Sequence, residues 1–222
     1  SEAREIIENH IFPTENMILP LLEALGFYTA EPIMATLDVP SFDNSAMDGY
    51  GFRFDDLKDS TKLKVTNTIP AGISTNDPIL GKGEAVRIFT GAKVPESIDT
   101  VVMQEKVVRN GDYIQCNTDE IKKGDHIRLK ASQTEKGTVI VEKNTFINHS
   151  VIGFLAGFGI EKVKVYKRLK IGLVFTGNEL VEVGKTLSDG EIYNSNTYTL
   201  QAALAEINHQ FSFIKHAEDR QE

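Results

Sequence analysis

Asp38 to Arg53 reads DVPSFDNSAMDGYGFR, a segment that crowds acceptor and turn-forming side chains among apolar ones. Val39 precedes a proline and is therefore held extended, and the Asp, Asn and Ser side chains that follow can bond their own backbone. The segment predicts a rigid loop in which Asp48 is a fixed carboxylate. Taken alone, the Asp48-Gly49 pair is also the strongest short signal for a β-hairpin turn. A turn does not require the other polar and aromatic residues of the segment, so we favour a functional site that contains Asp48.

The texture of the sequence changes several times along the chain. Residues 1–11 and 20–26 predict short helices, the second with Pro in its first turn and Gly just past its end. Short β-type runs separated by Gly, Pro, Asn and Asp then predict strands at 62–68, 85–90, 100–106 and 113–117. We therefore expect residues 36–133 to form one mainly β domain.

The elements that follow this domain are too few to make another one alone. Residues 138–142 and 163–166 predict strands, and residues 149–158 predict a helix. We expect them to join the N-terminal helices in one discontinuous domain, residues 1–35 plus 134–168. The mainly β domain would then be an insertion in that domain.

From residue 169 the pattern changes to strand, helix, strand. Residues 169–175 are almost continuously apolar, which is typical of a parallel strand buried on both faces. Asn196 is placed to cap a helix over residues 197–207, and residues 210–214 predict a second strand. Residues 169–222 are therefore expected to begin an α/β domain with a parallel sheet, and the predicted fold class is multi-domain α+β.

Composition limits the classes of function. The chain has 222 residues, 41% of them hydrophobic and 25% charged, which is enough for more than one domain. A formal net charge of −8 argues against nucleic acid as a partner. The apolar run 151–160 is too short to cross a bilayer, so we expect a cytoplasmic protein with no membrane partner. The single cysteine, Cys116, is expected to be a buried strand residue and not a nucleophile.

Two further segments carry polar side chains where predicted strands end. Residues 87–96, RIFTGAKVPE, bring Thr90 to a strand end, where free backbone N–H groups can hold an oxyanion. Residues 175–180, FTGNEL, follow the apolar strand, and ligands of open α/β sheets gather beyond the carboxyl ends of the strands. Thr90 and Glu179 are therefore candidate site residues. An ordinary strand-ending turn and a solvated loop carboxylate stay open as alternatives.

Together these segments resemble the molybdopterin molybdenumtransferases, a family whose relatives include the E domain of gephyrin. The resemblance is carried in order by residues 38–53, TGAKVP at 90–95, VVMQE at 101–105, TGNEL at 176–180 and DGEIYNSN at 189–196. It implies a role in molybdenum cofactor biosynthesis, the insertion of molybdate into adenylylated molybdopterin with release of AMP and help from Mg²⁺. It also implies a homodimer formed through the discontinuous domain, a molybdopterin-binding α/β domain, and the preceding adenylyltransferase of the pathway as a partner.

The resemblance also implies the roles of individual residues. Asp48, Thr90 and Glu179 are expected to be catalytic, and Asp48 is the candidate metal ligand, because carboxylates suit a hard cation such as Mg²⁺. In the family the cleft lies between protomers, so Asp48 and Glu179 are expected to meet across a subunit boundary. The expected substrate-binding residues are Ser45, Met47, Thr176, Gly177, Asn178, Asn194, Ser195 and Asn196.

Two departures from the family pattern bear on activity. After Ile127-Arg128 the family has two acidic residues, whereas this chain continues LKASQ, and the amide of Gln133 cannot balance a divalent cation. The 222 residues also end before the family's phosphate-binding turn, so we expect this chain alone to be inactive. A non-catalytic, gephyrin-like dimeric scaffold that binds a partner peptide is the main alternative. An adenylyl-transferring pterin enzyme is a third, disfavoured because such enzymes lack a loop like that of Asp48.

Overall fold

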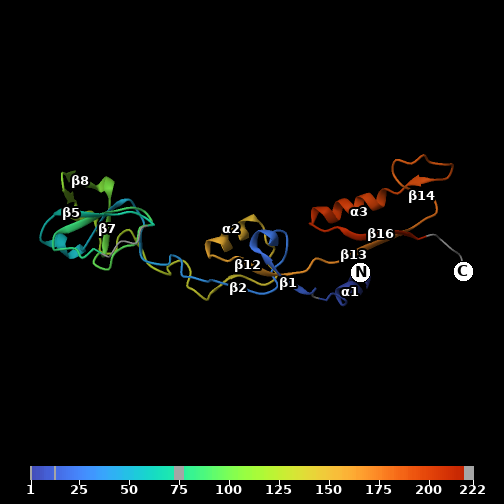
Figure 1. Ribbon diagram of the computed structural model, residues 1–222, viewed down its shortest axis with the longest axis horizontal. Coiled ribbons are helices and arrows are strands. Elements are labelled where there is room, and N and C mark those ends of the chain that lie inside the picture. The colour runs from blue at the N-terminus through green and yellow to red at the C-terminus, as the bar shows by residue number, and fades with distance from the viewer. Residues whose placement is uncertain (1, 13, 73–77, 218–222) are drawn as a thin grey trace. The chain divides into compact units, whose positions relative to one another are not determined.

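The computed structural model describes residues 2–12, 14–72 and 78–217. Contacts divide the chain into two compact units (Figure 1). The β unit is residues 34–140, and the discontinuous unit is residues 1–33 together with 141–222. The predicted mainly β domain, residues 36–133, lies within the β unit. The predicted α/β residues, 169–222, fall in the discontinuous unit.

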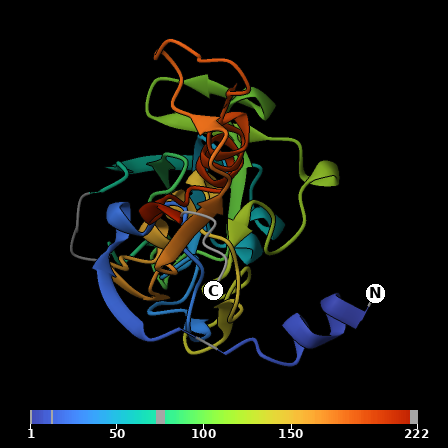
Figure 2. The same cartoon turned by 90° about the vertical axis from the view of Figure 1, so that its right-hand side faces the viewer.

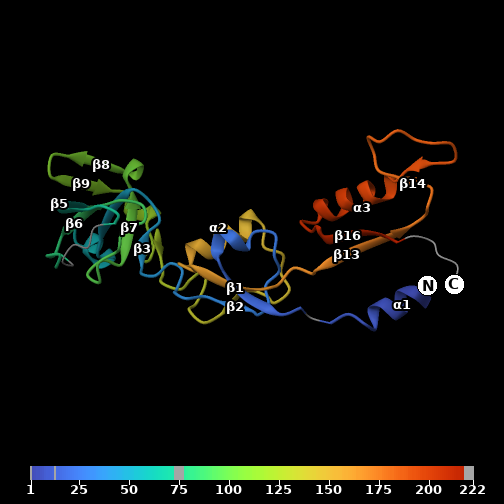
Figure 3. The same ribbon diagram turned by 45° about the vertical axis from the view of Figure 1, so that its right-hand side comes forward.

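The β unit is built on a six-stranded sheet with the strand order β7-β4-β6-β5-β9-β8 (Figure 3). Strands β5 and β6 pair in parallel, and the other neighbours are antiparallel. The strands of this sheet are β4 (Gly49–Phe52), β5 (Lys62–Ile69), β6 (Glu84–Ile88), β7 (Thr100–Met103), β8 (Val107–Asn110) and β9 (Tyr113–Cys116). The smaller elements of the unit are β3 (Asn44–Ser45), β10 (Ile127–Arg128) and the 3-10 helices η2 (Phe54–Lys58), η3 (Gln104–Lys106) and η4 (Thr118–Glu120). Strands β2 (Ile33–Met34) and β11 (Val139–Val141) cross its two boundaries.

Both faces of this sheet are covered by apolar side chains. Successive residues of a strand point to opposite faces, and accordingly Ala85 belongs to one buried cluster and Val86 to the other. Cys116 lies in β9 within the first cluster and is 5% exposed, which confirms the prediction of a buried strand residue. Burial raises the pKa of its thiol to about 11, so it is not ionised near neutral pH.

Part of the discontinuous unit is a two-stranded antiparallel sheet of β1 (Asn16–Pro20) and β12 (Lys162–Tyr166), accompanied by η1 (Leu21–Ala24) and α2 (His149–Gly157). The helix predicted over residues 20–26 is found only as one 3-10 turn, Leu21–Ala24. Pro20 ends β1 in register with Lys162, and Gly26 adopts a φ of 80° directly after a single 3-10 turn. Helix α1 (Glu2–Glu8) buries none of its side chains, and Figure 2 shows it standing clear of β1.

The rest of the discontinuous unit has the predicted strand, helix, strand order. Strands β13 (Ile171–Thr176) and β16 (Phe211–Ala217) pair in parallel, and β14 (Leu180–Val181), β15 (Ile192–Tyr193) and α3 (Ser195–Glu206) lie between them in the chain. Two expectations are corrected. The N-cap of α3 is Asn194 and not Asn196, because the Asn194 side chain accepts the N–H of Thr197 at 3.2 Å. Strand β13 is not buried on both faces: its residues alternate between half-buried and exposed, which is the pattern of a strand covered on one face only.

None of the helices in the described ranges is long and apolar enough to cross a membrane.

Candidate functional site

Asp48 directly precedes β4, a central strand of the six-stranded sheet. The next residue, Gly49, lies in register with Ile88 of β6 on one side and Met103 of β7 on the other. A Cβ atom at Gly49 would lie 2.0 Å from the carbonyl oxygen of Val102, so only glycine fits there. The hairpin alternative for Asp48-Gly49 is wrong, because β3 pairs with β10 while β4 pairs with β6 and β7.

The loop that leads to Asp48 is closed by hydrogen bonds. Ser45 is fully buried, and its hydroxyl donates to the Met47 carbonyl oxygen at 2.6 Å. Its backbone carbonyl accepts the N–H of Gly91 at 2.8 Å, and its N–H donates to the carbonyl of Ala92 at 3.0 Å. Ser45 therefore shapes the loop from within, whereas Met47 is 38% exposed and presents its side chain.

Thr90 donates two hydrogen bonds to Asp48. Its backbone N–H and its hydroxyl both reach Asp48 Oδ1, each at 2.8 Å. The backbone hydrogen bond is the main cause that lowers the pKa of the Asp48 carboxyl, followed by the hydroxyl bond, and the charge of Arg87 acts in the same direction. The expectation of a free N–H at Thr90 is corrected, because the anion it holds is the Asp48 carboxylate. Asp48 itself stays exposed, as does Thr90.

Three residues that sequence reasoning missed as site residues surround Asp48. Arg87 donates from Nη1 to the Gly49 carbonyl oxygen at 2.8 Å and from Nη2 to the side-chain oxygen of Gln104. The Gln104 amide donates to Glu105 Oε1 at 3.0 Å, which lowers the pKa of Glu105, while the Asp48 charge opposes that shift. Part of the signal was in the sequence, since Gln104 and Glu105 belong to a segment that carries the family resemblance, while Arg87 lies three residues before another.

Gln133 lies in a segment that packs along the start of the Asp48 segment. Its backbone N–H donates to the Val39 carbonyl oxygen at 3.0 Å, and its side chain is exposed. The carboxylates nearby in sequence to Val39 are already engaged: Asp38 accepts the N–H of Lys136 at 2.8 Å, and Asp43 accepts the N–H of Lys130 at 2.7 Å. The exposed Gln133 amide therefore stands on a backbone that is held in place.

The turn that contains Glu179 follows β13 in the discontinuous unit. Gly177 has a φ of 131°, and a Cβ atom there would lie 2.9 Å from a carboxylate oxygen of Glu179. Nε2 of His216 donates to the Gly177 carbonyl oxygen at 2.9 Å, and the His216 ring stacks on Phe175 with 4.9 Å between centroids. Thr176, Asn178 and Glu179 are exposed at this turn.

The remaining predicted substrate-binding residues lie at the start of α3. Asn194 is buried, with 6% of its surface exposed, and its side-chain oxygen is used as the helix cap. Ser195 and Asn196 are exposed in the first turn of the helix. The structure thus brings Asp48 and Thr90 together in the β unit, while Glu179 and residues 176–196 belong to the discontinuous unit.

Within residues 2–12, 14–72 and 78–217, no group of three or more His, Cys, Asp or Glu side chains is arranged to hold a metal ion. Mg²⁺ is usually bound through one or two carboxylates together with substrate phosphates and water. The ionised, exposed carboxylate of Asp48 fits a cation that arrives with a phosphate-bearing substrate. It does not make an all-protein metal site.

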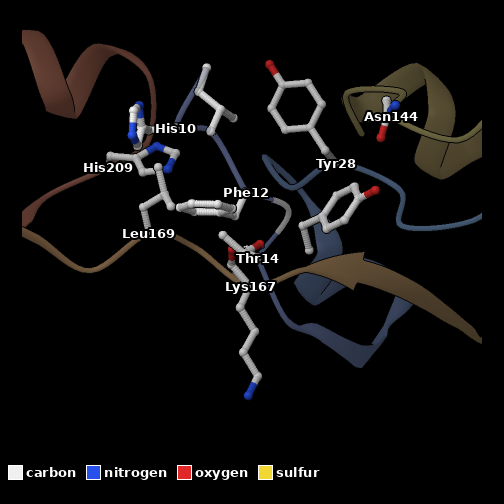
Figure 4. Close-up of a pocket in the computed structure, with 10 residues that line it drawn as sticks. His10, Phe12, Thr14, Tyr28, Asn144, Lys167, Leu169 and His209 are labelled. Atoms are coloured by element: carbon white, nitrogen blue, oxygen red, sulfur yellow. Dashed lines mark hydrogen bonds between the residues drawn. The ribbon is translucent and has the colours of Figure 1, made fainter. Parts of the chain in front are cut away.

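A separate cavity of about 600 Å³ lies in the discontinuous unit (Figure 4). Aromatic and aliphatic side chains dominate its wall, and several of them are largely exposed, such as Phe12 at 76% and Leu169 at 57%. None of the predicted site residues lines it. The lining residues are His10, Ile11, Phe12, Thr14, Tyr28, Asn144, Tyr166, Lys167, Leu169 and His209.

Comparisons with known proteins agree with the sequence motifs. The profile of the family described as the MoeA N-terminal region (domain I and II) matches residues 1–159. The molybdopterin molybdenumtransferase of Haemophilus influenzae is 40% identical over 203 residues, which cover 91% of this chain and 50% of that protein. The protein of the same name from Staphylococcus aureus is 34% identical over 223 residues, covering 98% and 53%. The chain spans about half the length of the curated relatives it matches.

Solved structures give the same family. A molybdopterin biosynthesis MoeA protein from Pyrococcus horikoshii OT3 has a TM-score of 0.89 at 29% identity, covering 99% of this chain and 60% of that one. Another structure of a molybdopterin biosynthesis MoeA protein, also from Pyrococcus horikoshii, has a TM-score of 0.85 at 32% identity, with 100% and 57% covered. The similarity therefore extends over all parts of the chain.

Proposed function

Because the chain belongs to the MoeA family of molybdopterin molybdenumtransferases, we propose that its protein inserts molybdate into adenylylated molybdopterin and releases AMP. The observation that carries the proposal is the Asp48 carboxylate, exposed on a rigid strand end and held by two donors of Thr90. A carboxylate with a lowered pKa is ionised at neutral pH. It is therefore ready to bind a cation or an electropositive centre.

The chain's own residues orient and charge this site. Thr90 engages Oδ1 of Asp48, so the second carboxylate oxygen is set in a fixed direction. Mg²⁺, when bound there with the substrate, would neutralise charge that builds up on phosphate and molybdate oxygens. Met47 would contact the substrate beside Asp48, since its side chain is partly exposed in the same loop.

We further propose that the protein is a homodimer in which Glu179 of one copy joins Asp48 of the other. The discontinuous unit exposes many large apolar side chains, among them Ile6 at 55%, Ile7 at 65% and Phe12 at 76%. Apolar surface of this extent marks contact sites, and a second copy would remove it from water. Light scattering at micromolar concentration tests this part, and a monomeric mass would contradict it.

The activity is tested by measuring AMP release from adenylylated molybdopterin in the presence of Mg²⁺, with and without molybdate. We expect molybdate-dependent release from the protein at the full length of its relatives, and none from residues 1–222 alone. Release that does not depend on molybdate would contradict the proposed reaction. Turnover by the 222-residue chain above the rate without enzyme would contradict the expectation of inactivity.

A non-catalytic scaffold is the second candidate, favoured by the exposed Gln133 at the place of a family acid. If the missing acid limits activity, Gln133→Asp in the full-length protein should raise the rate or strengthen its dependence on Mg²⁺. A higher rate of AMP release in Gln133→Asp would contradict the scaffold, because a non-catalytic protein would not gain activity from this one carboxylate. A dimer that binds a peptide partner and releases no AMP in either form would support the scaffold.

A further inference from the structure

Arg87 lies beside the Asp48 loop and is held between aromatic rings. It sits in β6 opposite Tyr50 of β4, and its guanidinium lies 5.1 Å from the Tyr50 ring centroid. The ring of Phe89, two residues further along the same face, lies 4.8 Å away. A guanidinium stacked in this way has little freedom to turn, because each ring face attracts it electrostatically.

The guanidinium fork links the backbone carbonyl of Gly49 to the side chain of Gln104. One nitrogen donates to the Gly49 carbonyl oxygen at 2.8 Å, and the other donates to the side-chain oxygen of Gln104. The backbone N–H of Gln104 in turn donates to the Asp48 carbonyl oxygen at 3.0 Å. A lysine cannot reproduce this pair of contacts in the same geometry, since its donors all lie on one nitrogen and do not form a planar fork.

Charge adds to this mechanical link. The positive charge of Arg87 lowers the pKa of Asp48, with a smaller influence than the two Thr90 hydrogen bonds. The same charge favours the ionised form of Glu105, which the negative charge of Asp48 opposes. Arg87 therefore lies near two carboxylates and its charge favours the ionised form of each, after the larger contributions of their hydrogen bonds.

We infer that Arg87 is a positioning residue that fixes the direction of the Asp48 carboxylate through Gly49 and Gln104. The inference rests on the proposed function for what Asp48 does with its cation and substrate. Its structural content, the coupling of Arg87 to the geometry and ionisation of Asp48, can be measured without any turnover. The sequence did not predict any residue that positions Asp48.

Two substitutions separate the fork from the charge. Arg87→Lys keeps the positive charge and removes the fork, whereas Arg87→Gln removes both. Arg109→Gln is the matched control, because Arg109 is an exposed residue of β8 at the opposite edge of the sheet from β7. The measurements are the pKa of Asp48 from its ¹³C carboxyl shift and the hydrogen exchange of the Gln104 and Thr90 amides, both in the 222-residue chain.

Arg87→Gln should raise the pKa of Asp48 toward its ordinary value and speed exchange of both amides about tenfold, the effect of losing one charged hydrogen bond. Arg87→Lys should speed exchange similarly and leave the pKa of Asp48 low. Arg109→Gln should change neither. Burial of Cys116, followed by its reactivity with a thiol reagent, reports whether each variant is folded; if Arg87→Gln does not fold, Arg87→Lys still gives the exchange result.

Folded Arg87 variants with unchanged amide exchange and an unchanged Asp48 pKa would overturn the inference. A loss of global stability with Asp48 unaltered would overturn it as well, because that is the result of packing alone. In the full-length protein, Arg87→Lys should lower kcat about tenfold with little change in KM. If the unaltered protein releases no AMP, the proposed function fails, while the exchange and pKa results still decide the role of Arg87.

Discussion

The Asp48 loop and the Glu179 turn each present an exposed carboxylate, on two different kinds of support. Asp48 joins a strand that has neighbours on both sides, and its carboxylate receives two hydrogen bonds from Thr90. Glu179 lies between strands of two-stranded sheets. In its turn the Gly177 carbonyl oxygen accepts from His216 and from the N–H of Leu180, and the Glu179 carbonyl oxygen accepts the N–H of Ile192. The first carboxylate is fixed by a packed sheet, whereas the second is held by a few contacts that open more easily. We therefore expect the β unit to supply the rigid half of the site.

The largest effect should come from the backbone that supports Asp48. Gly49→Ala places a Cβ atom 2.0 Å from the Val102 carbonyl oxygen, and a central strand must shift to accept it. We expect a loss of about 3 kcal/mol or more in the free energy of unfolding, measured with urea. Gly157→Ala in α2 is the control, because its Cβ meets nothing within 4 Å and should change stability by less than about 1 kcal/mol. Equal stabilities of the two variants would break the comparison.

The next effect concerns catalysis in the full-length protein. Asp48→Asn and Glu179→Gln each remove a charge with little change of shape, and each should lower molybdate-dependent AMP release about a hundredfold. Glu182→Gln is the control near the second site, because Glu182 pairs with Lys185 at 2.7 Å and is assigned no role. Near-normal rates for Glu179→Gln with a large loss for Asp48→Asn would confine the chemistry to the β unit.

A smaller effect is expected at the turn of Glu179. His216→Phe keeps an aromatic ring against Phe175 and removes the hydrogen bond to the Gly177 carbonyl oxygen. This should destabilise the turn by about 1 kcal/mol, seen as faster limited proteolysis near residues 176–180. His209→Phe is the control, because the His209 side chain bonds the carbonyl oxygen of Ile207, two residues earlier, and not the Glu179 turn. Unchanged proteolysis in both variants would show that the turn is held by other contacts.

The smallest effect is on the pH dependence of stability. Thr90→Val removes one of two donors to Asp48, so the pKa of Asp48 should rise but stay below its ordinary value, because the backbone N–H remains. A carboxylate with a lowered folded pKa stabilises the protein above its unfolded pKa, and that stability is lost as pH falls through the folded pKa. The acid-induced loss should therefore be smaller in Thr90→Val than in the unaltered chain, measured by thermal melting from pH 6 down to acid. An identical acid profile would contradict the role of the hydroxyl.

Much of this fold was predictable because local pattern and long-range pairing agree. The strands at 62–68, 85–90 and 113–117 are confirmed with ends shifted by at most two residues. Strand β4 was not predicted, since two of its four residues are glycines with poor strand propensity. It exists because β6 and β7 pair with it on both sides, which no local pattern shows.

The site residues, like the strands, divide into those that local sequence predicts and those that depend on long-range pairing. The motifs predicted Asp48 and Thr90 as site residues, but their contact depends on how β4 and β6 are paired across 42 residues of chain. Arg87 was missed because its partners, Gly49 and Gln104, are remote in sequence and join it only in the sheet. The cap of α3 was placed on Asn196 because Asn194 and Asn196 have the same propensity, and only the hydrogen bond to Thr197 distinguishes them.

The two chain segments that enter and leave the β unit lie side by side, which bears on how the unit can be exchanged in evolution. The N–H of Ala35 donates to the Thr138 carbonyl at 2.8 Å, and the N–H of Val39 donates to the Thr134 carbonyl at 2.8 Å. Residues close to the two ends of the unit are thus hydrogen-bonded to each other, and joining the ends costs little loop-closure entropy. A domain whose two ends lie side by side can be removed, replaced or lengthened while the paired strands β2 and β11 at its ends stay together. The β unit is therefore a piece that recombination could exchange whole, with Asp48, Thr90 and Arg87 travelling together.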